Sequence, residues 1–412
     1  MKKLPKIPQI RVKGFTQEWT EHLLNYYLET SKEKNFDGLY QREDVLSVSG
    51  DYGIINQIEF QGRSFAGASV LNYGVVHTGD VVYTKSPLKE NPYGIIKTNT
   101  GKAGVVSTLY AVYHPREVTY PEFVQWYFEN NDRLNHYLNP LVNKGAKNDM
   151  KVSSDNALLG MVVFPGYAEQ KAISDSFTHI KNIVLQCESR LKKLQTLKTS
   201  MLEKMFPKDG AAVPEIRFKG FDEKWSTIEL AQIADKVNEK NVQNYITETF
   251  TNSAEHGIIS QRDFFDHDIS KAEKINGYYI VEDNDFVYNP RVSVTAPCGP
   301  INCNRLGRTG VMSPLYTVFR THDIDTLFLE WYFKSSHWYA YMRFNGDSGA
   351  RSDRFSIKSD LFFKMPIPIP SMEEQHKIGQ ALQTLNENIK LNLQELDKLQ
   401  SIKKALLEKM FV

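Results

Sequence analysis

The two halves of the 412-residue chain repeat the same blocks of sequence in the same order, which constrains the fold more than any local pattern. Residues 7–19, IPQIRVKGFTQEW, recur 206 positions later as VPEIRFKGFDEKW. Further blocks pair in preserved order: DVVYTKS at 80–86 with DFVYNPR at 285–291, GVVSTLYAVY at 104–113 with GVMSPLYTVF at 310–319, FVQWYF at 123–128 with FLEWYF at 328–333, and LEKMF at 202–206 with LEKMF at 407–411. We therefore expect one structural plan that is used twice.

The segment that closes each half has the pattern of a long helix. Over 166–207 and again over 371–412, apolar residues recur in two rows seven positions apart, which is the pattern of a coiled coil. Ser371 and Glu374 have the spacing of a capping box at the start of the second helix. The alternative is that each helix packs on its own domain. The residues expected at the helix interface are Ile173, Ile180, Val184, Leu191, Leu194, Ile378, Leu385, Ile389, Leu396 and Leu399.

The segments between the helices, 20–165 and 226–370, differ in composition. They are rich in Tyr, Phe, Val, Ile and turn residues, which predicts irregular strands joined by Gly, Pro and Asn turns. Short helices are expected at 121–138 and 325–343. The predicted fold class is α+β. It is an internal tandem repeat of two globular domains, 1–165 and 208–370, alternating with two long helices, 166–207 and 371–412, that pair as an antiparallel coiled coil.

Charge and cysteine content exclude several classes of protein. Fifty Lys and Arg residues balance 49 Asp and Glu residues, so any basic surface is local. Cys187, Cys298 and Cys303 are too few and odd in number for a disulfide framework, which favours a reducing compartment. The N-terminus has no apolar signal region, and no stretch approaches 18 apolar residues. We expect a cytoplasmic protein with no membrane partner.

Motifs for catalysis are missing from the sequence. Gly101-Lys102-Ala103 lacks the other residues of a phosphate-binding loop, and there is no Gly-x-Gly-x-x-Gly or Gly-x-Ser-x-Gly motif. Cys298 and Cys303 would need two further ligands to hold zinc, and none lies nearby at a suitable spacing. We therefore assign no catalytic residue, no metal ligand and no bound cofactor to this chain.

Basic and polar residues coincide with predicted turns at equivalent places in the two halves. One pair of turns follows the strands ending near residues 84 and 290, and the other is Gly-Ala-Lys-Asn and Gly-Ala-Arg-Ser. Lys and Arg side chains pair with guanine acceptors, and Asn pairs with adenine. Solvated loop charges would have the same composition. The candidate DNA contacts are Lys85, Ser86, Lys147, Asn148, Arg291, Ser293, Arg351 and Ser352.

The plan as a whole resembles the specificity subunit of type I restriction-modification systems. The resemblance spans essentially the full chain. Its most specific carrier is GARSDRFSIKSDLFFKMPIPIPSMEEQHKI at 349–378, followed by the weaker copy GAKNDMKVSSDNALLGMVVFPGYAEQKAI at 145–173 and the LEKMF ends of both helices. The first copy departs from the family pattern at 163–167, where it has Val-Phe-Pro-Gly-Tyr before the helix.

This resemblance implies a non-catalytic reader of double-stranded DNA. Its two globular domains would be target-recognition domains, each reading one half of an interrupted, asymmetric sequence. The paired helices would dock two methyltransferase (modification) subunits, and restriction/translocase subunits would join them. S-adenosylmethionine, ATP and magnesium would bind to those partners.

The length of the helices agrees with such a role. About 37 helical residues would give a spacer of about 55 Å, which exceeds the roughly 34 Å of one DNA turn. The alternative is a coiled-coil scaffold protein that binds other proteins and does not bind DNA.

Overall fold

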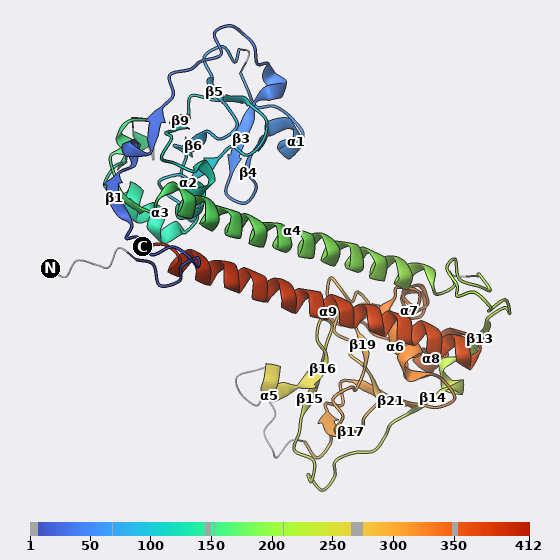
Figure 1. The fold of residues 1–412 in the computed structure, drawn as a ribbon. Helices are drawn as coiled ribbons and strands as arrows, with labels where there is room; N and C mark the ends of the chain where they lie inside the picture. Colours follow the sequence, from blue (N-terminus) through green and yellow to red (C-terminus); the bar gives the residue numbers. More distant parts are fainter. Residues whose placement is uncertain are drawn as a thin grey trace. The chain divides into compact units, whose positions relative to one another are not determined.

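The chain forms two compact units in the computed structural model, which describes residues 7–67, 69–144, 150–151, 153–208, 210–264, 275–347 and 353–412. Unit 1 comprises residues 1–188 and 394–412, and unit 2 comprises residues 189–393 (Figure 1). The boundaries between the units fall inside the two long helices, so each helix contributes residues to both units. The division of the chain at residues 165, 207 and 370 rests on sequence pattern and stays a prediction.

Unit 1 is built around a four-stranded antiparallel sheet with the strand order β2-β9-β6-β7, accompanied by the two-stranded pairs β1-β12, β3-β4, β5-β8 and β10-β11. The strands are β1 (Thr20–Leu23), β2 (Leu28–Thr30), β3 (Leu46–Ser49), β4 (Gly53–Asn56), β5 (Gly74–Val76), β6 (Val81–Thr84), β7 (Ile96–Thr98), β8 (Gly104–Val106), β9 (Tyr110–Pro115), β10 (Asn143–Lys144), β11 (Met150–Lys151) and β12 (Met161–Phe164). The short helices are α1 (Gln57–Gln61), α2 (Pro121–Tyr127) and α3 (Asn131–Leu138), with 3-10 turns η1 (Leu24–Tyr26), η2 (Arg42–Asp44) and η3 (Asn156–Leu158).

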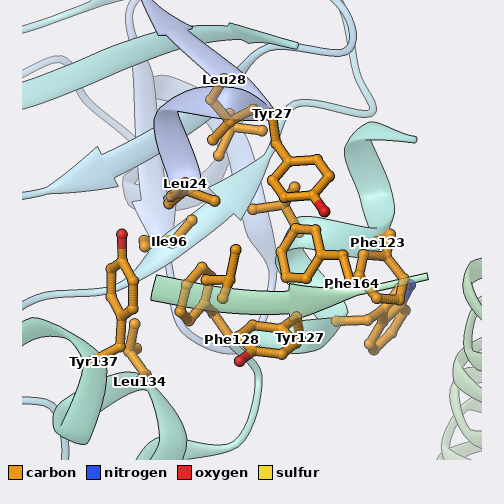
Figure 2. Close-up of a cluster of buried hydrophobic side chains, with 14 of the residues drawn as sticks. Leu24, Tyr27, Leu28, Ile96, Phe123, Tyr127, Phe128, Leu134, Tyr137 and Phe164 are labelled. Atoms are coloured by element: carbon orange, nitrogen blue, oxygen red, sulfur yellow. The ribbon is translucent and has the colours of Figure 1, made fainter. Parts of the chain in front are cut away.

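The core of unit 1 lies where α2 and β12 cover the sheet. Figure 2 shows aromatic side chains of both elements grouped with Tyr27. The ring of Phe164 lies 4.5 Å from that of Tyr27 and 4.8 Å from that of Phe123, measured between centroids. Pro121 occupies the first turn of α2, where its missing N–H costs no hydrogen bond. Burial of each such large side chain contributes on the order of 2 kcal/mol, so this cluster fixes α2 on the sheet.

Unit 2 has a four-stranded sheet with the order β14-β21-β18-β19 and the two-stranded pairs β13-β22, β15-β16 and β17-β20. Its strands are β13 (Ser226–Glu229), β14 (Ala234–Lys236), β15 (Phe250–Ser253), β16 (Gly257–Ser260), β17 (Tyr279–Val281), β18 (Phe286–Tyr288), β19 (Ile301–Cys303), β20 (Gly310–Met312), β21 (Thr317–Thr321) and β22 (Pro366–Ile369). Its helices are α5 (Gln261–Phe264), α6 (Thr326–Lys334), α7 (Tyr339–Asn345) and α8 (Ser359–Phe363), with the 3-10 turn η4 (Leu230–Gln232).

The strand orders of the two four-stranded sheets correspond one to one. In unit 1, β2 and β6 both run antiparallel to β9, so they are parallel to each other and their carboxyl ends point the same way. In unit 2, β14 and β18 stand in the same relation to β21. Each segment expected to hold short helices contains two of them, α2 and α3 in one case and α6 and α7 in the other.

The two long helices are α4 (Tyr167–Lys204) and α9 (Met372–Lys409). In unit 1, Phe177 near the start of α4 shares a core with Met410 and Phe411, which follow the last turn of α9. In unit 2, Phe206 at the end of α4 shares a core with Leu382 near the start of α9. Within each unit the start of one helix is therefore packed with the end of the other.

A buried ion pair anchors the first turn of each long helix. Arg11 donates from Nε and Nη2 to the carboxylate of Glu169, at 2.7 and 2.8 Å. Arg217 makes the same two bonds to Glu374, at the same distances. Hydrogen bonding to each carboxylate raises the pKa of both arginines. The expected capping box is therefore only half formed: the N–H of Glu374 donates to Ser371 Oγ at 3.4 Å, but its carboxylate is held by the arginine.

The glutamine that follows each of these glutamates is also buried and links two helix starts. Gln170 donates to the carbonyl of Pro165 and accepts from the N–H of Tyr120, the residue before α2. Gln375 donates to the carbonyl of Pro370 and accepts from the N–H of Asp325, the residue before α6. The repeated Glu-Gln dipeptide thus fixes the long helix to the short helix in each unit.

Candidate nucleic-acid interface

Lys85 and Ser86 follow β6 at the carboxyl end of that strand. The N–H of Lys85 donates to the carbonyl of Leu109 at 3.1 Å, and its Nζ lies 3.4 Å from Ser154 Oγ. Burial of the half-buried side chain lowers the pKa of Lys85, and the charge of Lys34 lowers it further. Two cations from segments that follow β2 and β6 therefore lie near each other, as the common direction of these strands requires.

Arg291 and Ser293 lie in the equivalent turn after β18, and both are exposed. The N–H of Arg291 donates to Asn289 Oδ1 at 3.0 Å, and the N–H of Ser293 donates to the carbonyl of Ala296 at 3.0 Å. These two bonds from backbone N–H groups close the turn, and the side chains of Arg291 and Ser293 stay exposed. The side chain of Val294, at the tip of the turn, is fully exposed.

Four of the eight candidate DNA contacts, Lys147, Asn148, Arg351 and Ser352, lie outside the described residues. Their chain neighbours can be placed. Val292 donates to the carbonyl of Asp353 at 3.1 Å, and Arg291 forms a β-bridge with Arg354. The residues next to the second candidate turn thus lie beside the Arg291 turn. In unit 1, β10 and β11 pair on either side of residues 145–149.

Sequence inspection missed Lys34 and the exposed apolar residues beside the candidate turns. Leu88 is exposed in the turn after β6, and Val294 is exposed in the turn after β18. The signal for Lys34 is a short repeated block, Glu-Lys-Asn, at 33–35 and again at 239–241. This block is only three residues long. The structure shows that both copies follow equivalent strands, β2 and β14, so the block places a lysine at the same end of each sheet.

The described residues offer no metal centre, since nowhere do three His, Cys, Asp or Glu side chains among them converge as ligands. Cys298 and Cys303 are buried free thiols, and burial raises the pKa of both. Both thiols are therefore held protonated. None of the helices in the described part of the chain is long and apolar enough to cross a membrane.

The ten residues expected at the helix interface are all at least half-buried. Ile173, Leu191, Ile378, Leu385 and Ile389 are buried. The other five are partly buried: Ile180, Val184, Leu194, Leu396 and Leu399. Ile173 belongs to the core of unit 1, and Ile378 belongs to the core of unit 2.

Comparison with known proteins identifies the second half of the chain. Residues 222–401 match the family model described as the type I restriction modification DNA specificity domain. The match covers β14, β18 and β21 and the turn that carries Arg291, together with most of α9. The resemblance to specificity subunits that the sequence suggests is therefore confirmed.

Relatives of the specificity domain extend the similarity beyond these residues. The chain is 22% identical over 284 residues to the protein named as the MjaX specificity subunit of a type I restriction enzyme in Methanocaldococcus jannaschii. That alignment covers 64% of this chain and spans 61% of the relative's length.

One of the matching solved structures supports the fold. The type I restriction-modification S subunit from M. genitalium matches with a TM-score of 0.57 at 12% identity, covering 98% of this chain and 99% of that one. The HsdS subunit from Thermoanaerobacter tengcongensis matches with a TM-score of 0.46 at 15% identity, covering 95% and 96% of the two chains.

Proposed function

We propose that the chain is the non-catalytic specificity subunit of a type I restriction-modification complex. In this role it reads a bipartite, asymmetric DNA target, one half-site per recognition domain, and directs adenine-methyltransferase and restriction subunits to it. The observation that carries the proposal is that both units place a basic residue at the same end of the four-stranded sheet. Lys85 follows β6 and Arg291 follows β18, at equivalent places, and the second of these lies in a DNA specificity domain.

The two recognition domains are proposed to bind different DNA sequences but to be attached to the long helices by the same contacts. The turns after β6 and β18 differ in sequence, Lys-Ser-Pro-Leu at 85–88 against Pro-Arg-Val-Ser at 290–293, as expected if each reads different base edges. The Arg–Glu pairs and the buried glutamines at the helix starts are the same in both units. Because these contacts are the same, the two units would present equivalent surfaces to two identical methyltransferase subunits.

The long helices are proposed to pair as an antiparallel coiled coil that spaces the two readers. Support comes from each unit separately, since Phe177 packs with Phe411 and Phe206 shares a core with Leu382. In both cases the start of one helix meets the end of the other. Cofactors of methylation and cleavage would bind to partner subunits, and the complex would act on DNA in the cytoplasm.

The first test is sequencing of methylated adenines in the host genome with and without this gene. Deletion should remove methylation from one interrupted, asymmetric motif and from no other. If every methylated motif persists while the partner methyltransferase genes are expressed, the alternative of a scaffold that does not bind DNA is favoured.

Individual contacts can then be tested in the assembled complex. Arg291→Ala should relax one position of one half-site, by about 1–3 kcal/mol if the guanidinium pairs with a base. Lys85→Ala is the matched variant, and its effect should be confined to the other half-site. Unchanged affinity and an unchanged target for both variants would remove these turns from the interface.

A further inference from the structure

Each unit carries a short loop with the same unusual brace. Asn35 and Asn241 are fully buried, and each side chain bridges the base of its loop. Asn35 accepts from the N–H of Tyr40 at 2.9 Å and donates to its carbonyl at 2.8 Å. Asn241 makes the same pair of bonds to Ile246, at 3.3 and 2.8 Å.

The backbone of the two loops, 35–40 and 241–246, is also the same. The fourth residue of each, Gly38 or Asn244, has a positive φ, of 69° or 54°, which Gly and Asn tolerate best. Its N–H donates to the carbonyl of the bracing asparagine at 3.0 Å in both loops. The loop shape is therefore fixed by its own hydrogen bonds.

These braced loops hold apolar side chains in solvent. Phe36 and Leu39 are 71% and 70% exposed in the first loop, and Val242 and Tyr245 are 73% and 65% exposed in the second. Scattered exposed apolar residues are ordinary on protein surfaces, but a pair of them on a turn that is held by its own hydrogen bonds, in each of the two units, points to a binding site. Because each brace prevents the loop from folding back, the side chains remain available to a partner.

The surroundings of the loops favour DNA as that partner. The first loop leaves β2 at the sheet end that carries Lys85, with Lys32 and Lys34 exposed just before it. In the second unit, the exposed Lys236 and Lys240 precede the corresponding loop, at the sheet end that carries Arg291. An apolar tip bordered by cations suits a nucleic-acid groove, where the cations meet phosphates and the apolar groups meet bases.

We propose that loops 35–40 and 241–246 are apolar wedges that enter a groove of the DNA and contact or unstack a base step, one in each half-site. This inference rests on the proposed function and adds specificity-determining residues to it. The loops keep the brace and the positive φ while every exposed apolar residue changes. Identical protein partners would require identical tips, whereas two different half-sites require different ones.

The test uses the full chain assembled with its methyltransferase subunits and a duplex containing the methylated motif. 2-Aminopurine, whose fluorescence rises when it is unstacked, is placed at successive positions of each half-site. The wild-type complex should raise the fluorescence at one step in each half. The double variant Phe36→Ser with Leu39→Ser should abolish the signal in the first half-site alone and weaken binding by about tenfold. Val242→Ser with Tyr245→Ser should do the same in the second.

Matched controls are exposed apolar residues elsewhere in the same units, Leu159→Ser for unit 1 and Phe344→Ser for unit 2. Both should leave fluorescence and affinity unchanged. Phe36→Tyr, which keeps the aromatic ring, should keep the fluorescence signal in the first half-site. If the double variants bind DNA like wild type, the loops are not wedges, and the proposed function is unaffected. Double variants that lose the methyltransferase subunits indicate protein docking and also overturn the wedge. A wild-type complex with no preference for the motif would instead defeat the proposed function.

Discussion

At the scale of single residues, the ion pairs at the helix starts are the contacts most sensitive to loss of one partner. The side chain of Glu374 is fully covered, and that of Arg217 is largely so. Removing the arginine leaves a buried carboxylate without its counterion, which costs more than the intact pair contributes. Arg217→Met should therefore lower the free energy of unfolding by about 3 kcal/mol, measured by denaturant titration followed through the tryptophans.

The double variant Arg217→Met with Glu374→Met is the control for this prediction. It removes both charges, so it should recover much of the stability that Arg217→Met loses. If the double variant is no more stable than the single variant, the cost comes from lost packing of the arginine stem. Arg11 and Glu169 allow the same cycle in unit 1.

Glu129 gives the stability of unit 1 a dependence on pH. Burial by itself would raise the pKa of Glu129, but Lys97, bonded at 2.6 Å, together with Lys403 and Lys181, lowers it below the ordinary 4.5. A carboxyl whose pKa is depressed on folding stabilises the fold above its unfolded pKa, and this contribution is lost as the pH falls through the folded pKa. Unit 2 has Lys334 at the equivalent position.

Glu129→Gln should accordingly destabilise unit 1 at neutral pH by about 2 kcal/mol, because Lys97 loses its counterion. As the pH falls below the ordinary 4.5 and through the lower pKa of the folded state, the difference from wild type should shrink toward zero, because the wild-type carboxyl becomes protonated as well. Thermal unfolding at pH 7 and at pH 3.5 measures both values. A difference that is the same at both pH values would contradict the assigned role of the Lys97–Glu129 pair.

At the scale of elements, the long helices could be predicted from sequence and the sheets could not. The period of seven is a local signal, and α4 and α9 begin and end within a few residues of the expected segments. By contrast, β1 pairs with β12 and β13 with β22, so each pair joins strands more than 130 residues apart in sequence. Nothing in a strand of four residues specifies so distant a partner. The capping box failed for the same reason, since its glutamate is held by a distant arginine.

The proposed pairing of the two long helices yields a prediction about assembly. Leu194 is half-buried on α4, at one of the positions expected to face the other helix. A charge there would have to be desolvated in the helix interface, so Leu194→Asp should abolish capture of the methyltransferase subunits by the tagged chain. Gln195→Asp, exposed on the same turn, is the control and should leave capture intact. A Leu194→Asp chain that still assembles fully would argue that the helices do not pair along this row.

At the scale of the whole molecule, the two helix ends stabilise the unit formed by the other half of the sequence. Phe206 closes the first half, yet its ring packs on Phe328 and Tyr332 in unit 2. Phe411 closes the second half, yet its ring packs on Phe123 and Tyr127 in unit 1. The backbone follows the same rule, since Ile10 donates to the carbonyl of Lys409 and Ile216 to that of Lys204.

This exchange predicts that a substitution near residue 412 destabilises unit 1. Phe411→Ala should cost unit 1 about 3–5 kcal/mol, because it leaves a cavity among buried aromatic rings. Hydrogen exchange should then accelerate over 123–128 and leave 328–333 unchanged. The matched variant Phe206→Ala should produce the reverse. Under the proposed function each half-site is recognised by its own unit, so Phe411→Ala should relax the half-site proposed to be read by residues of the first half, among them Lys85. Faster exchange at 328–333 in Phe411→Ala would contradict this assignment of helix ends to units.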